Sequence, residues 1–142
     1  PTMNDNLLET RQLSNGTTLH LYDTSRRQGT GHGVVVMEAR LEIPVDDRCL
    51  PPGQRDGLSI NTIGEALGSC VVYVSRKERV FVPDEDKAGL ISAFQEEFCR
   101  NAVPYLLHPA FPSRFIIKQY REHQKKKAWQ DAAATQPDQD LP

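Results

Sequence analysis

Long hydrophobic runs and an excess of either charge are both missing from this chain. It has 142 residues, with 17 Lys and Arg against 19 Asp and Glu, so its formal net charge is −2 at pH 7. No apolar run approaches the ~20 residues of a membrane-spanning helix. We therefore expect no membrane insertion, and the near-neutral charge does not favour nucleic acid as a partner.

Paired cysteines are missing as well. Cys49, Cys70 and Cys99 are widely spaced and odd in number, and no CxxC or Cys/His spacing suited to a metal occurs. No signal peptide is visible. We expect reduced thiols, a cytoplasmic location, and neither a metal site nor a cofactor.

A recognisable set of catalytic groups is the third absence. His20, His32, His108 and His123 are scattered, with no i, i+4 pair and no carboxylate at a useful spacing. No nucleophile, general base and orienting group can be named together. We therefore predict no catalytic residues and a protein that is not an enzyme. A site assembled in space from distant residues stays open.

What the chain does contain is one strong helical pattern, in residues 84–105. Its apolar stripe consists of Ile91, Phe94, Phe98, Ala102 and Tyr105. Asp84 follows a proline and is the predicted N-cap. Pro104 removes a backbone hydrogen bond, so we predict a break near residues 100–103 and a short final turn to Leu107.

Residues 71–82 before this helix read as one strand. Val72, Val74, Val80 and Val82 share one face by alternation. A hairpin at residues 75–78 is the alternative, but no Gly, Asn or Pro supports a turn there. We expect the charged middle of the strand to face solvent or to lie at a sheet edge.

Two further strands are predicted upstream. Residues 34–45 show the period-two pattern of a strand, with Val35, Met37, Ala39, Leu41 and Ile43 on one face and Glu38, Arg40 and Glu42 on the other. Pro44 ends the strand or places it at an edge. Asn15-Gly16 predicts a hairpin turn before a strand at residues 17–23. Residues 1–10 fit either a short helix or a frayed arm.

The remaining segments are shorter. Residues 46–57 form a loop, and residues 59–67 form a short helix that Gly68 ends. Residues 113–124 fit a helix or a strand, with Ser113 as a possible cap. We predict one α+β domain at residues 1–124, with a three- to four-stranded antiparallel sheet against one long kinked amphipathic helix and a possible C-terminal helix. Residues 125–142 are predicted to be a polar, disordered tail.

The candidate ligand site is a basic, glycine-rich loop, and its residues are Arg26, Arg27, Gly29, Gly31, His32 and Gly33. The guanidinium group of arginine donates paired hydrogen bonds to phosphate or carboxylate. Glycines let backbone N–H groups approach an anion closely. No Walker or GxGxxG pattern is present. A solvated connection is the alternative interpretation of this loop.

Asp23-Thr24-Ser25 followed by Gly29 resembles the D/N-x-S-x-x-G motif of PilZ cyclic-dinucleotide receptors. The glycine lies one position late, and of the upstream Arg-x-x-x-Arg only Arg11 is present. The resemblance implies an anionic ligand but covers too few residues to assign the family.

Charge is segregated along the chain. The helix at 84–105 is acidic, whereas the C-terminal segment is basic through Arg114, Lys118, Arg121 and residues 125–127. Together with Tyr120 and Trp129, such a basic segment is able to bind RNA or a membrane surface. The simpler interpretation is that the two segments neutralise each other, within the fold or between subunits.

We therefore predict a small non-catalytic interaction or regulatory domain whose exposed strand edge or helix face meets a protein partner or a second copy. The alternative is an anion- or nucleotide-binding module that holds a phosphorylated small molecule at the Arg26–Arg27 loop.

Overall fold

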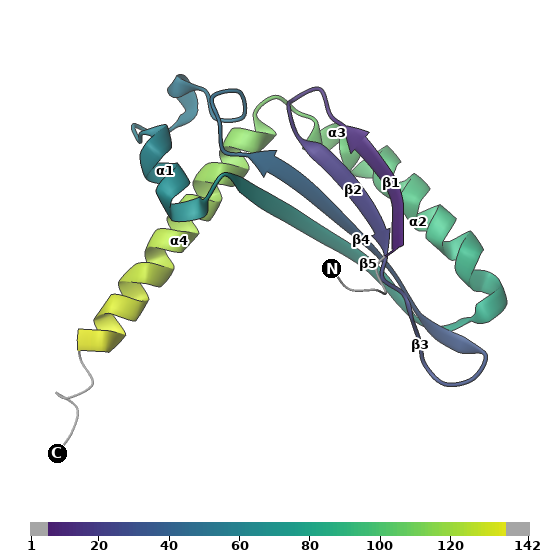
Figure 1. The fold of residues 1–142 in the computed structure, drawn as a ribbon. Coiled ribbons are helices and arrows are strands. Elements are labelled where there is room, and N and C mark those ends of the chain that lie inside the picture. Colours follow the sequence, from purple (N-terminus) through teal and green to yellow (C-terminus); the bar gives the residue numbers. More distant parts are fainter. Residues whose placement is uncertain (1–5, 136–142) are drawn as a thin grey trace, which may run out of the picture.

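The computed structural model describes residues 6–135, which build one curled antiparallel sheet with helices on one face and at one end (Figure 1). The strands are β1 (Asn6–Gln12), β2 (Thr18–Asp23), β3 (Arg26–Arg27), β4 (His32–Pro44) and β5 (Cys70–Pro83). Strand β4 is central: β2 and the short β3 pair with one side of it, β5 pairs with the other, and β1 extends the sheet beyond β2.

The helices follow a simple order. They are α1 (Ile60–Leu67), α2 (Lys87–Asn101), α3 (Val103–Leu106) and α4 (Phe111–Thr135), with 3₁₀ turns η1 (Pro52–Gln54) and η2 (Asp84–Asp86). Helices α2 and α3 cover one face of the sheet, while α1 and the start of α4 pack together at its end (Figure 1). The predicted α+β class is confirmed, and the two-residue β3 makes the sheet five-stranded.

The N-terminal hairpin is confirmed, but its details differ from the prediction. Residues 6–10 belong to strand β1 and not to a helix, because pairing with β2 satisfies their backbone groups. Gly16 lies at φ 91° and closes a three-residue loop, with Gly16 N–H bonded to Leu13 O at 3.2 Å. Asn15 keeps a negative φ, and its amide instead donates to the carbonyls of Leu106 and His108 at 2.7 and 3.1 Å.

Strand β5 is a single strand, as predicted, but it contains a bulge. Val35 pairs with Arg79 and Gly33 with Val82, which leaves Val80 and Phe81 as the bulged pair, with Phe81 at φ 56°. The bulge reverses the alternation of faces. Val82 is therefore buried at 5% exposure, and the prediction that it shares the face of Val80, which is 49% exposed, is wrong.

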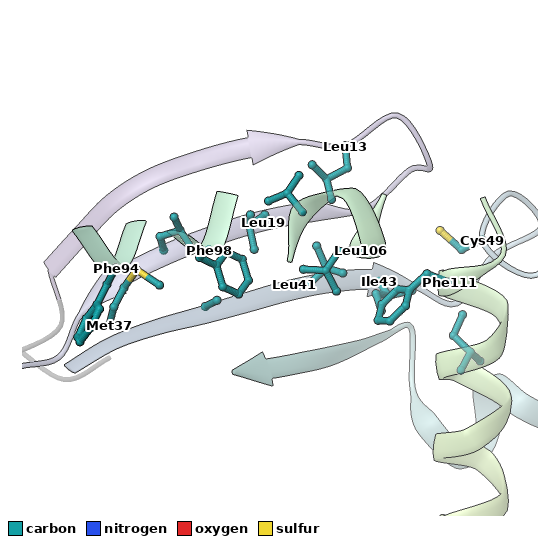
Figure 2. Packing of buried hydrophobic residues seen from close by; sticks show 14 of the residues in the cluster. Leu13, Leu19, Met37, Leu41, Ile43, Cys49, Phe94, Phe98, Leu106 and Phe111 are labelled. Atoms are coloured by element: carbon teal, nitrogen blue, oxygen red, sulfur yellow. The ribbon is translucent and has the colours of Figure 1, made fainter. Parts of the chain in front are cut away.

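The apolar stripe of α2 packs on the sheet as predicted. Ile91, Phe94 and Phe98 are buried, and Figure 2 shows the core running from Met37 and Phe94 at one end to Ile43 and Phe111 at the other. The alternating apolar residues of β4 all lie in this core; they are Val35, Met37, Ala39, Leu41 and Ile43. One contiguous cluster thus joins the sheet to the helices.

The predicted break near Pro104 is confirmed, since α2 ends at Asn101 and α3 begins at Val103. The break turns Tyr105 away from the core, so its inclusion in the stripe is wrong: its exposure is 64%. Asp84 is not a side-chain N-cap either. The chain enters α2 through the turn η2, and the Asp84 carboxylate faces Arg27 instead.

The short helix α1 has the predicted ends, with Ser59 Oγ accepting from Thr62 N–H and Gly68 following its last turn. Residues 113–124, for which the sequence allows a helix or a strand, belong to helix α4. It begins before Ser113, whose buried hydroxyl donates to Ala110 O at 3.2 Å.

Helix α4 also continues to Thr135, through residues for which the sequence predicts disorder, because Lys, Gln and Ala are strong helix formers. Residues 136–142 lie outside the described part of the chain. Along residues 6–135, no helix is long and apolar enough to cross a membrane.

Candidate functional site

The predicted glycine-rich loop is the tip of the β3–β4 hairpin. Arg26 pairs with Val34 and Arg27 with Gly33. A Cβ on Gly33 would lie 2.6 Å from the Arg26 carbonyl oxygen, so this glycine is required by the close approach of two strands. Gly29 and Gly31 shape the turn at the tip. The glycines therefore have a structural explanation that needs no ligand.

The tip of the β3–β4 hairpin is bonded to the turn η2, which leads into α2. Arg27 Nη2 lies 2.7 Å from Asp84 Oδ2, and Asp84 N–H donates to Gly31 O at 2.9 Å. His32 lies against the exposed Phe81 ring, with 5.9 Å between ring centroids. The expected flexible loop is thus held at both its basic and its glycine residues.

A small cavity of about 280 Å³ lies beside this tip. Arg26, Arg27 and Gly33 line it together with Lys87 and Asp84, whereas Gly29, Gly31 and His32 are not among its lining residues. Asp84 pairs with Arg27, and Asp23 lies 3.6 Å from Lys87. Two of the three cations therefore already face a carboxylate, which weakens the cavity as an anion site.

The segment that resembles the PilZ motif links strands. Ser25 N–H donates to the Asp23 side chain at 2.9 Å, and Ser25 Oγ accepts from Val36 N–H at 2.9 Å. Both side chains are engaged in joining β2 to β4.

Activated thiols and metal-binding clusters are not found among residues 6–135. The three cysteines are free. Burial raises the pKa of Cys49 to about 11, and burial likewise raises the pKa values of Cys70 and Cys99. Thiols with raised pKa values stay protonated near neutral pH, so none of the three is poised as a nucleophile.

The helix-free face of the sheet carries cross-strand ion pairs. Glu38 lies opposite Arg76, whose Nε donates to Glu38 Oε1 at 2.6 Å, and Arg40 donates to the other carboxylate oxygen. Arg40 also stacks over the Tyr22 ring at 4.4 Å. Glu38 is consequently buried on a face that the sequence predicts to be wet.

The acidic helix and the basic C-terminal segment do not neutralise each other among the described residues. Glu97 of α2 pairs with Lys77 of β5, and Glu96 with Arg100 of its own helix. In α4, Arg121 pairs with Asp56 of the loop after η1. Neutralisation of the two segments within the fold is therefore wrong, neutralisation between subunits stays a prediction, and most of the basic charge of α4 faces solvent.

Aromatic side chains from three elements meet where β5, α3 and α4 come together. Tyr73, Tyr105, Phe111 and Phe115 line a pocket of about 230 Å³. The centroid of the Phe111 ring lies 5.6 Å from that of Tyr73 and 5.1 Å from that of Tyr105, and both pairs are edge-to-face. Phe111 and Phe115 are stacked, with 5.9 Å between ring centroids. Phe111 is buried at the base, whereas Tyr105 is largely exposed.

Two cations, Arg114 and Lys118, complete the lining of this aromatic pocket. His108 also lines it, with its Nδ1 accepting from Ala110 N–H at 3.0 Å, and no carboxylate does. No ion pair is formed by Arg114 or Lys118 within residues 6–135. Such a pocket suits a ligand with two parts. An apolar or aromatic group of the ligand fills the pocket, and a negatively charged group next to it meets the cations.

The cationic side continues along α4. Arg114, Lys118, Arg121 and Lys125 recur at spacings of four, three and four residues, so they form one stripe along the helix. All four line an open groove of about 860 Å³ between α4 and the η1 loop, where Asp56 and Glu122 are the acidic members. We call the pocket and this stripe together the aromatic–basic groove.

Sequence reasoning missed this groove. It counts Tyr105 with the core and leaves Tyr73 in an alternating strand, although it notes the basic residues of α4. The available signal was the density of aromatic and cationic residues between positions 105 and 118, which only the contact with β5 turns into a pocket.

Comparison of the chain with models of protein families, with curated proteins and with solved structures gives no match. The function is therefore argued from the site alone.

Proposed function

We propose that the protein is a non-catalytic interaction domain that binds an acidic segment of a partner protein in the aromatic–basic groove. The observation that carries this proposal is the lining of the pocket: four aromatic rings, the two cations Arg114 and Lys118, and no carboxylate. An apolar or aromatic side chain of the partner fills the pocket, and acidic residues on one side of it follow the stripe along α4.

The expected affinity follows from the two parts of the site. Burying one large apolar side chain in the pocket contributes about 2–3 kcal/mol. Each exposed charge pair along α4 adds about 0.2–1 kcal/mol and is weakened by salt. Binding should therefore be modest and salt-sensitive, with the aromatic anchor contributing more than any single charge.

A labelled peptide tests this proposal directly. The probe is a short peptide of Glu and Gly with one Trp, measured by fluorescence anisotropy. Replacing its Trp by Ala, or its Glu residues by Lys, should remove most of the binding. Replacing Arg114 and Lys118 by Glu in the protein should weaken binding about tenfold or more, because two attractive pairs become repulsive.

A matched control comes from the same helix. Lys127→Glu makes the same kind of charge change on the opposite face of α4 and should leave binding nearly unchanged. Tyr105→Ala removes an exposed wall of the pocket without opening the core. Tighter binding of single-stranded oligo(U) RNA than of the acidic peptide would reject a protein segment as the ligand.

The anion-binding alternative at the hairpin tip is supported by one observation, the shared cavity of Arg26, Arg27 and Lys87. Its cations are largely neutralised by Asp84 and Asp23, which makes it the weaker candidate. A thermal-shift panel of nucleotides, cyclic dinucleotides and sugar phosphates should leave the melting temperature unchanged. A ligand that stabilises the wild type but not the Arg26→Ala, Arg27→Ala variant would restore this alternative.

A further inference from the structure

Strand β5 has an open edge. Among the residues that the structure describes, only β4 pairs with β5, and the opposite side of its backbone has no strand beside it (Figure 1). Long exposed edges of this kind are templates for pairing with another strand. Exposed apolar side chains accompany the edge on its helix-free face: Val72, Val74, Val80 and Phe81.

The backbone direction of each residue in β5 follows from its bonds to β4. Val45 N–H donates to Ser69 O at 2.9 Å, and Pro44, opposite Cys70, has no N–H to donate. In an antiparallel pair the bonded and unbonded positions alternate. Odd-numbered residues of β5 therefore bond to β4, and up to the bulge the even-numbered residues direct N–H and C=O toward the open side.

We propose that a second copy of this chain pairs with β5 in an antiparallel manner, with the two-fold axis at Lys77. The alternation above allows only registers in which even-numbered residues face even-numbered residues. A two-fold at Arg76 would place two arginines face to face, and a two-fold at Glu78 would place two glutamates face to face. Both registers bring like charges together on directly opposite residues.

The register centred on Lys77 instead brings opposite charges together at positions 76 and 78. It places Arg76 opposite Glu78 of the second copy, and symmetry repeats this pair. Arg76 donates to Glu38 through Nε, and its terminal nitrogens make no hydrogen bond and Glu78 no ion pair among the described residues. Isologous pairing of this kind closes after two copies.

The two central lysines are the one like-charge contact in this register. Each Lys77 already pairs with Glu97 of its own α2, which offsets its charge on the helix side of the sheet. The bulge at Val80 and Phe81 ends regular pairing, so the interface covers residues 75–79 and leaves the aromatic–basic groove outside it.

A cysteine scan identifies the register. Cysteines are introduced singly at positions 75–79 in a Cys70→Ser, Cys99→Ser background, where the remaining Cys49 is buried. Under mild oxidation only Lys77→Cys should form a disulfide-linked dimer, because position 77 alone faces itself. Cross-linking at 76 or 78 in its place would overturn the register, and cross-linking at none of the five positions would overturn the pairing.

Sedimentation of the full chain provides the second measurement. The wild type should dimerise with rising concentration, and Glu78→Arg should weaken dimerisation about tenfold by placing two arginines opposite each other. Glu65→Arg on α1 makes the same charge change away from β5 and should have no effect. A monomeric wild type, or equal behaviour of both variants, would overturn the proposal. The peptide assay for the aromatic–basic groove is unaffected by either outcome.

Discussion

The guanidinium of Arg76 on β5 donates to the carboxylate of Glu38 on β4, with 2.6 Å between Nε and Oε1. The two residues are register partners, and Arg40 donates to the second carboxylate oxygen of Glu38. Burial raises the pKa of Glu38, but the hydrogen bonds from Arg76 and Arg40 outweigh it and hold the pKa below its usual 4.5.

This arrangement predicts an acid-sensitive contribution to stability. Because the folded-state pKa of Glu38 is lowered, its stabilising effect is present above the unfolded-state pKa of about 4.5 and is lost as the pH falls through the folded-state value. Glu38→Gln should lower the free energy of unfolding by about 1–3 kcal/mol at pH 7. Urea unfolding at several pH values should show a smaller difference between the two proteins in acid. A difference independent of pH would contradict this role of Glu38.

Gly33 should be among the least replaceable glycines of the chain. A Cβ at this position would lie 2.6 Å from the Arg26 carbonyl oxygen, so Gly33→Ala must separate β3 from β4. We expect a loss of about 1–3 kcal/mol in chemical unfolding. Gly53→Ala is the matched control, since no atom lies within 4 Å of its Cβ position and its φ is not in the left-handed region. Equal stability of both variants would refute the tight pairing of β3.

The packing of α2 on the sheet predicts a contrast between its two faces. Phe94 is buried at 8% exposure, and Phe94→Ala should cost about 3–5 kcal/mol. Phe94→Asp should yield unfolded or insoluble protein. Glu97→Gln removes only an exposed ion pair with Lys77 and should change stability by less than about 1 kcal/mol. Thermal melts of the three variants check the contrast, and a normally melting Phe94→Asp would disprove the helix orientation.

Local patterns in the sequence were sufficient for most elements of the fold. The stripe of Ile91, Phe94 and Phe98, the alternation in residues 34–45 and the break before Pro104 each depend on residues close in the chain. Features that depend on distant contacts were not predictable. The Phe81 bulge moves Val82 into the core. The ion pair of Asp84 depends on Arg27, which lies in the β3–β4 hairpin.

The candidate site divides in the same way. The basic residues of α4 and the arginines of the hairpin tip are visible in the sequence, but their surroundings are not. Asp84 pairs with Arg27 of the hairpin and Asp23 pairs with the neighbouring Lys87, whereas Tyr73 of β5 completes the pocket beside Arg114 and Lys118. The three-dimensional contacts therefore favour the aromatic–basic groove, which local sequence patterns do not show as a site.

A nuclear magnetic resonance titration of the labelled protein with the acidic, Trp-containing peptide tests the central claim most directly. It reports the position of binding as well as its strength. The account predicts resonance shifts at Tyr73, Tyr105, Phe115 and Lys118, which saturate with peptide and decrease with added salt. Shifts confined to residues 26–33, or no shifts at high peptide concentration, would contradict it.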